Sequence, residues 1–149
     1  MKMETHQQKV ERAYAQGRLR EWGNCVRRIT MSGAPRANIY SRQPFSNERM
    51  NFDMKTTEQQ LFAGRVWDRA IEVDEILMPV READDSQWRA VVIRYVIREH
   101  GGIRRLPQEI QLIQFKHSTG LGRNAYYRKL KRVEQFLAMG LGVSPPAPV

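Results

Sequence analysis

Side chains that could contact nucleic-acid bases are concentrated in one short basic segment, residues 123–132. An arginine can donate two hydrogen bonds to guanine and an asparagine can pair with adenine, and each such pair contributes about 1–3 kcal/mol of discrimination between bases. Nearby cations could contact phosphates and so position the reading helix. The predicted base-reading residues are Arg123, Asn124, Tyr127, Arg128 and Lys131, and the predicted phosphate contacts are Arg104, Arg105, Lys116, Lys129 and Arg132.

Two helices must hold these side chains. One is predicted over about 123–139, where Tyr126, Leu130, Val133 and Leu137 form an apolar stripe opposite the basic residues. The other starts at Leu106-Pro107, because proline suits the first position of a helix, and its inward residues should be Ile110, Ile113 and Phe115. His117–Gly122 is the expected turn between them. Residues 104–139 thus have the layout of a helix-turn-helix, with a turn longer than the about three or four residues of the tight form. The alternative is a helical hairpin with a solvated basic face.

The rest of the chain predicts three more helices, so the expected fold class is all-α, with about five helices and no strand hairpin. Capping boxes at Thr5–Gln8 and Thr57–Gln60 should start helices over about 7–28 and from 57 to Pro79, which should stop the second. A third should run from a cap at Asp84–Ser86 to Gly101-Gly102. We expect an N-terminal helix within 1–30, a long loop over 31–56, a helical domain over 57–142 and a loose proline-rich tail over 143–149.

The charge of the chain supports a polyanionic partner. The 149 residues include 25 Lys+Arg and 16 Asp+Glu, for a formal charge of +9. The excess is uneven, because residues 1–56 carry +6, residues 57–85 carry −5 and residues 86–132 carry +9. A basic excess on one part of a chain is the electrostatic pattern of nucleic-acid binding. The basic segment therefore favours DNA over a merely solvated face.

Other classes of protein find little support in the composition. Cys25 is the single cysteine, which excludes an intramolecular disulfide framework or a multi-cysteine zinc site. The apolar runs are far shorter than the about 20 residues that cross a bilayer, and we expect no secretion signal, no cofactor and a cytoplasmic location. We expect no enzyme activity. A magnesium nuclease site could only be assembled from acidic residues that are more simply a solvated helix face or helix caps, namely Glu72, Asp74, Glu75, Asp84 and Asp85.

Four segments together resemble a known family, the phage late antiterminator Q proteins of the lambdoid phage 21 type and related prophage proteins. They are Gln16-Gly-Arg-Leu-Arg-Glu-Trp-Gly23, Ala70-Ile-Glu-Val-Asp-Glu-Ile76, Arg94-Tyr95-Val96 and Tyr127-Arg-Lys-Leu-Lys-Arg-Val133. The last segment also resembles the DNA-reading region near the C-terminus of sigma factors. Each motif is short, but their order and spacing cover nearly the whole chain.

The resemblance implies a protein that binds double-stranded DNA beside a phage late promoter in a bacterial host. Such a protein loads onto paused RNA polymerase and suppresses pausing and termination, with sigma factor and nascent RNA as further candidate partners. By position, the helix over 123–139 would read DNA. Four arginines of the N-terminal helix would meet polymerase or RNA, namely Arg18, Arg20, Arg27 and Arg28. The alternative that stays open is a helix-turn-helix repressor or activator, which would form a dimer on a palindromic site.

Overall fold

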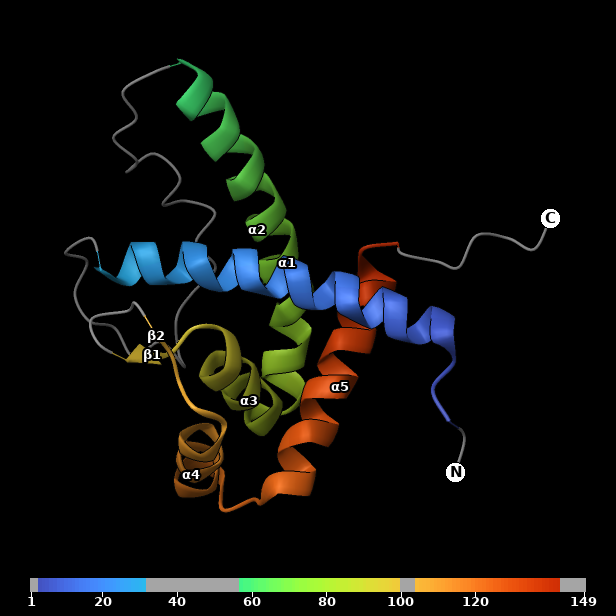
Figure 1. The fold of residues 1–149 in the computed structure, drawn as a ribbon. Helices are drawn as coiled ribbons and strands as arrows, with labels where there is room; N and C mark the ends of the chain where they lie inside the picture. The colour runs from blue at the N-terminus through green and yellow to red at the C-terminus, as the bar shows by residue number, and fades with distance from the viewer. Residues whose placement is uncertain (1–2, 32–56, 100–103, 143–149) are drawn as a thin grey trace.

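The structure, a computed structural model, describes residues 3–31, 57–99 and 104–142, and for residues 28–31 and 57–63 it describes the backbone alone. Within these ranges the chain forms five α-helices and one pair of short strands (Figure 1). They are α1 (His6–Met31), α2 (Thr57–Ala83), α3 (Asp85–Tyr95), β1 (Arg98–Glu99), β2 (Arg104–Arg105), α4 (Gln108–Thr119) and α5 (Arg123–Gly140). The all-α class is confirmed. The expected loop from residue 32 onward and the expected tail lie outside the described residues.

Local capping chemistry starts two of the helices where the sequence predicts. At α1 the backbone N–H of Gln8 donates to Thr5 Oγ1 at 3.1 Å, and the N–H of Thr5 donates to Gln8 Oε1 at 2.8 Å. This reciprocal pair satisfies two N–H groups that have no partner inside the helix. At α3 the Asp84 carboxylate accepts the Ser86 N–H at 3.0 Å. The side chains of the Thr57–Gln60 box lie outside the described residues.

Proline does not stop α2. Pro79 lies on the exposed side of the helix, which continues to Ala83. A proline inside a helix removes one backbone hydrogen bond and crowds the preceding turn, at a cost of about 3 kcal/mol. Leu77 and Val80 flank it and are buried in the core. Burial of two such side chains contributes about 3–6 kcal/mol and offsets the cost of the proline. The rule that proline ends a helix does not consider the burial of neighbouring residues.

Helix α3 ends earlier than predicted, and a small strand pair follows it. The helix stops at Tyr95, and β1 pairs antiparallel with β2 so that Arg98 faces Arg105 and Glu99 faces Arg104. The prediction of no strand hairpin was therefore wrong at this point. Arg27 of α1 donates hydrogen bonds to the carbonyl oxygens of Tyr95 and Val96, at 2.7 and 3.2 Å. A cation at a helix C-terminus is favourable, so α1 helps to fix where α3 ends.

One core joins all five described helices. Helix α1 crosses both α2 and α5, and α3 packs against all three of these helices (Figure 1). Trp22, Trp67 and Trp88 are 1%, 2% and 3% exposed, as the apolar stripes predicted. The rings of Trp22 and Trp88 meet edge to face at 5.6 Å, and the Trp22 indole N–H donates to Asp74 Oδ1 at 2.9 Å. The N-terminal helix thus belongs to the same core as residues 57–142 instead of standing apart from them.

The crossing of α1 and α3 depends on a glycine. A Cβ atom added at Gly23 would lie 2.0 Å from the carbonyl oxygen of Tyr95, far inside van der Waals contact. At Gly17, two turns earlier, an added Cβ would meet nothing within 4 Å. The sequence marks both glycines only as weak points of a helix, whereas the structure requires one of them.

Candidate nucleic-acid interface

The connection between α4 and α5 is shorter than predicted. His117, Ser118 and Thr119 complete the last turn of α4, so three residues, Gly120 to Gly122, join the helices. Gly120 has a φ of 75°, a left-handed conformation that glycine adopts without strain, and its N–H donates to the Lys116 carbonyl at 2.8 Å. The Thr119 hydroxyl accepts the Leu121 N–H at 3.1 Å. The turn therefore has the length of the tight helix-turn-helix connection, about three or four residues.

A buried polar link holds α5 against α4. The Tyr126 hydroxyl donates to Gln111 Oε1 at 2.7 Å, and Gln111 Nε2 donates to the Leu106 carbonyl at 2.8 Å. Phe115 packs edge to face on Tyr126 at 5.0 Å. Burial raises the pKa of Tyr126 above its ordinary value of 10.0, so the hydroxyl remains a donor. Sequence reasoning missed Gln111, because an isolated polar residue on a helix normally faces solvent.

The outer side of α5 carries a row of polar side chains, which we call the outer row: Asn124, Arg128 and Arg132. They recur at four-residue steps and all three are exposed. Within the part of the chain that the structure describes, none of them forms a hydrogen bond or ion pair. Lys116 is exposed in the last turn of α4. Arg123 is exposed at the start of α5, with its guanidinium 5.8 Å from the centre of the Tyr127 ring.

The other predicted residues of α5 lie on its flanks. Tyr127 is half-buried and accepts a hydrogen bond from the Gln108 side chain. Lys131 lies 3.7 Å from Glu4, with 43% of its side chain exposed.

Lys129 does not join the predicted phosphate contacts, because it pairs with Asp84 at 2.7 Å and is only 13% exposed. Burial alone would raise the pKa of Asp84, but hydrogen bonds from Lys129 and Ser86 outweigh it and lower this pKa to about 2. The prediction for Lys129 was therefore wrong: it fixes the start of α3 to α5.

Arginines gather where β1 and β2 meet α1 and α3, and we call Arg20, Arg94, Arg98 and Arg105 the hairpin arginines. Arg104 and Arg105 are exposed on β2, as their predicted role requires. Partial burial lowers the pKa of Arg105, and the positive charges of Arg94, Arg98 and Arg20 lower it further. Four like charges close enough to repel one another form a strongly positive surface. Sequence reasoning missed Arg94 and Arg98, although both lie in the segment of charge +9.

The predicted contacts on the N-terminal helix do not form one surface. Arg18 is nearly buried and bonds to three groups: the Tyr14 hydroxyl at 3.1 Å, the Arg69 carbonyl at 3.1 Å and Glu72 at 3.0 Å. Arg27 holds the end of α3, and burial together with Arg98 lowers its pKa to about 10. Both therefore stabilise the fold. Arg20, one of the hairpin arginines, is exposed, and the Arg28 side chain lies outside the described residues.

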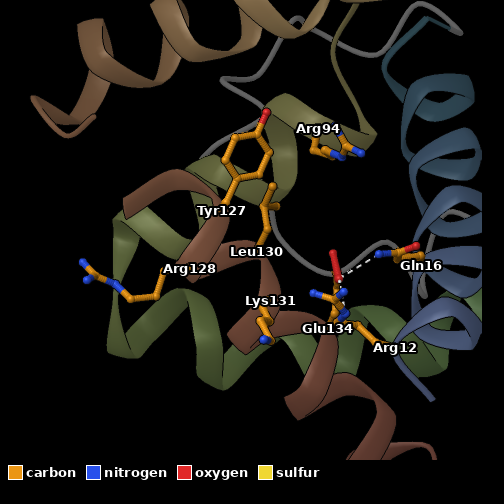
Figure 2. Close-up of a pocket in the computed structure, with 8 residues that line it drawn as sticks. All are labelled: Arg12, Gln16, Arg94, Tyr127, Arg128, Leu130, Lys131 and Glu134. Atoms are coloured by element: carbon orange, nitrogen blue, oxygen red, sulfur yellow. Dashed lines mark hydrogen bonds and ion pairs between the residues drawn. The ribbon is translucent and has the colours of Figure 1, made fainter. Parts of the chain in front are cut away.

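A groove lies between α1, α3 and α5, and we call it the three-helix groove (Figure 2). It has a volume of about 340 Å³. Leu130 lies between its two ends, with Tyr127 and Arg94 at one end and Gln16, Arg12 and Glu134 at the other (Figure 2). Arg128 and Lys131 complete the lining. The groove thus combines four cations, one aromatic ring and one carboxylate. Arg128 belongs both to its lining and to the outer row.

Glu134 is the carboxylate of that groove and is 4% exposed. Its oxygens accept hydrogen bonds from Gln16 at 2.9 Å and from the Tyr95 hydroxyl at 3.2 Å, while Arg12 lies 3.7 Å away. Burial raises its pKa above the ordinary value of 4.5, and these partners oppose the shift. One acidic residue thus connects α5 to α1 and α3. Its partners are far away in the sequence, so no local signal could identify it.

Four of the five acidic residues considered for a nuclease have separate structural roles, and the fifth, Glu75, is exposed on α2. Glu72 pairs with Arg18, Asp74 is buried against Trp22, and Asp84 and Asp85 lie at the start of α3. Among residues 3–31, 57–99 and 104–142, no group of three or more His, Cys, Asp or Glu side chains is placed to hold a metal ion. Nor does any helix in those ranges have the length and apolar character needed to cross a membrane.

Comparisons with known proteins give no information on function, which must be inferred from the residues of this chain. No family model matches the chain, and no match was found among curated proteins or among solved structures.

Proposed function

We propose that the protein binds double-stranded DNA through α5 and acts as a phage transcription antitermination factor. The observation that carries the DNA part is the outer row: Asn124, Arg128 and Arg132 are exposed and lack partners within the described residues, on a helix that follows a three-residue turn. Ordering a long cationic side chain costs conformational entropy. Side chains that have no partner within the protein have not yet paid this cost, and their charged groups remain able to contact a ligand.

The spacing of the outer row suits a major groove. The groove admits one α-helix, and the outward side chains near the N-terminus of that helix contact base edges. Arg123 and Asn124 occupy the first turn of α5, and Arg128 lies about one turn further along. Lys116, Arg104 and Arg105 precede α5 and are exposed, as phosphate contacts should be. The buried link through Tyr126 and Gln111 supports the proposal, because a reading helix must be held rigidly.

The antitermination part of the proposal rests on the resemblance to the late antiterminator Q proteins of the phage 21 type. In this proposal DNA is the loading site and the partner acted upon is RNA polymerase. Exposed Arg20 is the N-terminal arginine best placed for that contact, since Arg18 and Arg27 are bound within the fold.

Two measurements test the proposal in order. In gel shifts at fixed salt on the phage late promoter region, Arg128→Ala should reduce sequence preference, whereas Arg105→Ala should weaken binding to all sequences alike. Arg65→Ala is the matched control, because Arg65 is an exposed arginine on α2. Unchanged DNA affinity in both test variants would refute the contact surface.

A reconstituted transcription reaction then tests antitermination. The template carries the late promoter and a downstream terminator, and readthrough should rise when the protein is added. DNA binding with unchanged readthrough would refute antitermination and leave a repressor or activator.

A further inference from the structure

The three-helix groove differs chemically from the outer row, because it is concave and contains an aromatic ring, an apolar side chain and a buried carboxylate. Its volume of about 340 Å³ is at the lower end of the range for small-ligand pockets, about 300–1,000 Å³. A duplex cannot enter a pocket of this size. A single planar group with an attached anion can.

The four cations of the groove differ in the partners that they have within the protein. At one end Arg12 Nε lies 3.2 Å from one oxygen of Glu4, and Lys131 Nζ lies 3.7 Å from the other. Glu134 lies 3.7 Å from Arg12, so two carboxylates of the chain offset the charge of these two cations. At the opposite end Arg94 has Gln111 Oε1 at 3.5 Å and the Tyr95 hydroxyl as polar neighbours, and its charge also acts on Glu134. Arg128, which points away from Arg94 in Figure 2, has no partner among the described residues. Arg94 and Arg128 are therefore the cations of the groove without an ion pair among the described residues, and of the two Arg94 lies at the end where Tyr127 lies (Figure 2).

The uncharged part of the lining suits a flat ring. Tyr127 is half-buried, and Leu130 lies between it and Glu134. Glu134 has two oxygens, each engaged by one donor, and a carboxylate can accept about four hydrogen bonds. It can thus still accept an N–H from the edge of a base. Its negative charge also keeps a phosphate away from that end of the groove.

The positive surface continues beyond the groove. Arg94 lines the groove and also lies near Arg105, which faces Arg98 across the paired strands. Arg20 of α1 borders the same cluster. A repeated anion such as a phosphate backbone could contact Arg94 and then the hairpin arginines in succession. A basic groove that follows a backbone, with an aromatic side chain beneath the bases, is the general arrangement of single-strand binding sites.

We propose that the three-helix groove binds one unpaired nucleotide of a single-stranded nucleic acid, with the phosphates continuing towards the hairpin arginines. The base lies against Tyr127 and Leu130, its polar edge faces Glu134, and its phosphate contacts Arg94. This site goes beyond the duplex contact proposed above and does not require it. Arg128 borders both surfaces and is therefore left out of the test.

The test is fluorescence anisotropy with labelled ten-nucleotide single strands of RNA and of DNA, beside a labelled duplex. Tyr127→Leu should weaken single-strand binding roughly 5- to 100-fold, while Tyr127→Phe, which keeps the ring, should retain most of it. Arg94→Gln should weaken binding and reduce the slope of log affinity against log salt by about 0.7, the contribution of one phosphate contact. Arg132→Gln is the control, since Arg132 is on the outer row and does not line the groove. It should weaken duplex binding alone.

The two single strands identify the source of the nucleotide. Tighter binding of RNA indicates that the 2′-hydroxyl is recognised, and equal binding indicates that base and phosphate suffice. No single-strand binding by the wild-type protein, or equal binding by Tyr127→Leu, overturns the proposal. So does displacement of the oligonucleotide by a poly-glutamate peptide of equal charge at equal concentration.

A direct measurement protects the test against variants that fail to fold. The wild-type protein is irradiated with a single strand carrying one thio-substituted base, and the crosslinked residue is identified by mass spectrometry. Crosslinks at Tyr127 or Leu130 support the site, and crosslinks confined to other elements refute it. If the wild-type protein binds single strands but no duplex, the proposed function fails while this inference stands.

Discussion

The side-chain amide of Gln16 on α1 donates a 2.9 Å hydrogen bond to the buried carboxylate of Glu134 on α5, which lies 118 residues further along the chain. The Tyr95 hydroxyl of α3 donates to the other oxygen of that carboxylate. Three helices that the sequence places far apart are thus joined at one acidic group. Its protonation, as well as its presence, should affect the stability of the fold.

Replacing Glu134 by glutamine should leave the protein as stable as wild type or more stable at pH 7. Burial raises the folded-state pKa of Glu134, so ionisation opposes folding, and stability falls as pH rises from the unfolded pKa of 4.5 through the folded one. The neutral amide avoids this loss and can still bond to Gln16 and Tyr95. Urea unfolding at pH 4 and pH 7 checks the expectation. From pH 4 to pH 7 the free energy of unfolding of the wild type should fall relative to that of E134Q. The same difference between the two proteins at both pH values would contradict the expectation.

Glycines of α1 should respond in opposite ways to the same substitution. Gly23→Ala places a methyl group 2.0 Å from the Tyr95 carbonyl oxygen, so the α1–α3 crossing must open and stability should fall by about 3 kcal/mol or more. Gly17→Ala meets nothing within 4 Å and should stabilise the helix by about 0.5–1 kcal/mol. Thermal unfolding followed by circular dichroism compares the two. Equal melting temperatures for the pair would argue against the observed crossing.

The ion pair between Lys129 and Asp84 should make stability depend on acid pH. The pKa of Asp84 is lowered to about 2 in the folded protein from an ordinary value of 3.8, so its contribution is present above pH 4 and is lost as pH falls to 2. Asp84→Asn keeps a good N-cap residue and removes the charge. The difference in melting temperature between wild type and D84N should be constant above pH 5 and close by pH 2. A difference that persists at pH 2 would show that the cap, not the charge, is responsible.

Tyr126→Phe should destabilise the contact between α4 and α5 without changing the fold. The variant keeps the ring that packs on Phe115 but removes the donor to Gln111 Oε1, so a buried acceptor loses its 2.7 Å partner. The acceptor keeps only the long 3.5 Å contact from Arg94, and a poorly paired buried polar group costs up to about 1–3 kcal/mol. Urea unfolding should show a lower midpoint with an unchanged slope. An unaltered midpoint would mean that another donor, such as Arg94, replaces the hydroxyl.

Patterns that depend on neighbours in sequence predicted most of the fold, but they were wrong about two inward residues of α4. Ile110 and Ile113 are 39% and 63% exposed, and of the three expected residues only Phe115 is buried. The Thr5–Gln8 capping box, the Asp84 cap and the buried tryptophans follow from spacing alone, and each is present. Pro79 shows the limit, because its effect was overridden by the burial of residues on either side. The turn after α4 is also shorter than expected, because His117, Ser118 and Thr119 belong to the last turn of α4.

The candidate site was predicted only on its exposed side. The helical spacing of apolar and polar residues along α5 separates the outer row from the core, so Asn124, Arg128 and Arg132 could be identified. The groove could not, because it depends on how α1 lies against α3 and α5, and its defining residues, Arg94 and Glu134, have no local pattern. Lys129 resembles its basic neighbours in sequence and is distinguished from them by its ion pair with Asp84 at the start of α3.

The close contact at Gly23 has a mechanical consequence. Because α1 and α3 touch backbone to backbone there, and Glu134 ties α5 to both, α1 cannot slide without breaking these contacts. A displacement of α5 should therefore be accompanied by a displacement of α1. If the proposed function is correct, a partner on the outer side of α1 would bind a helix whose position relative to α5 is fixed by these contacts.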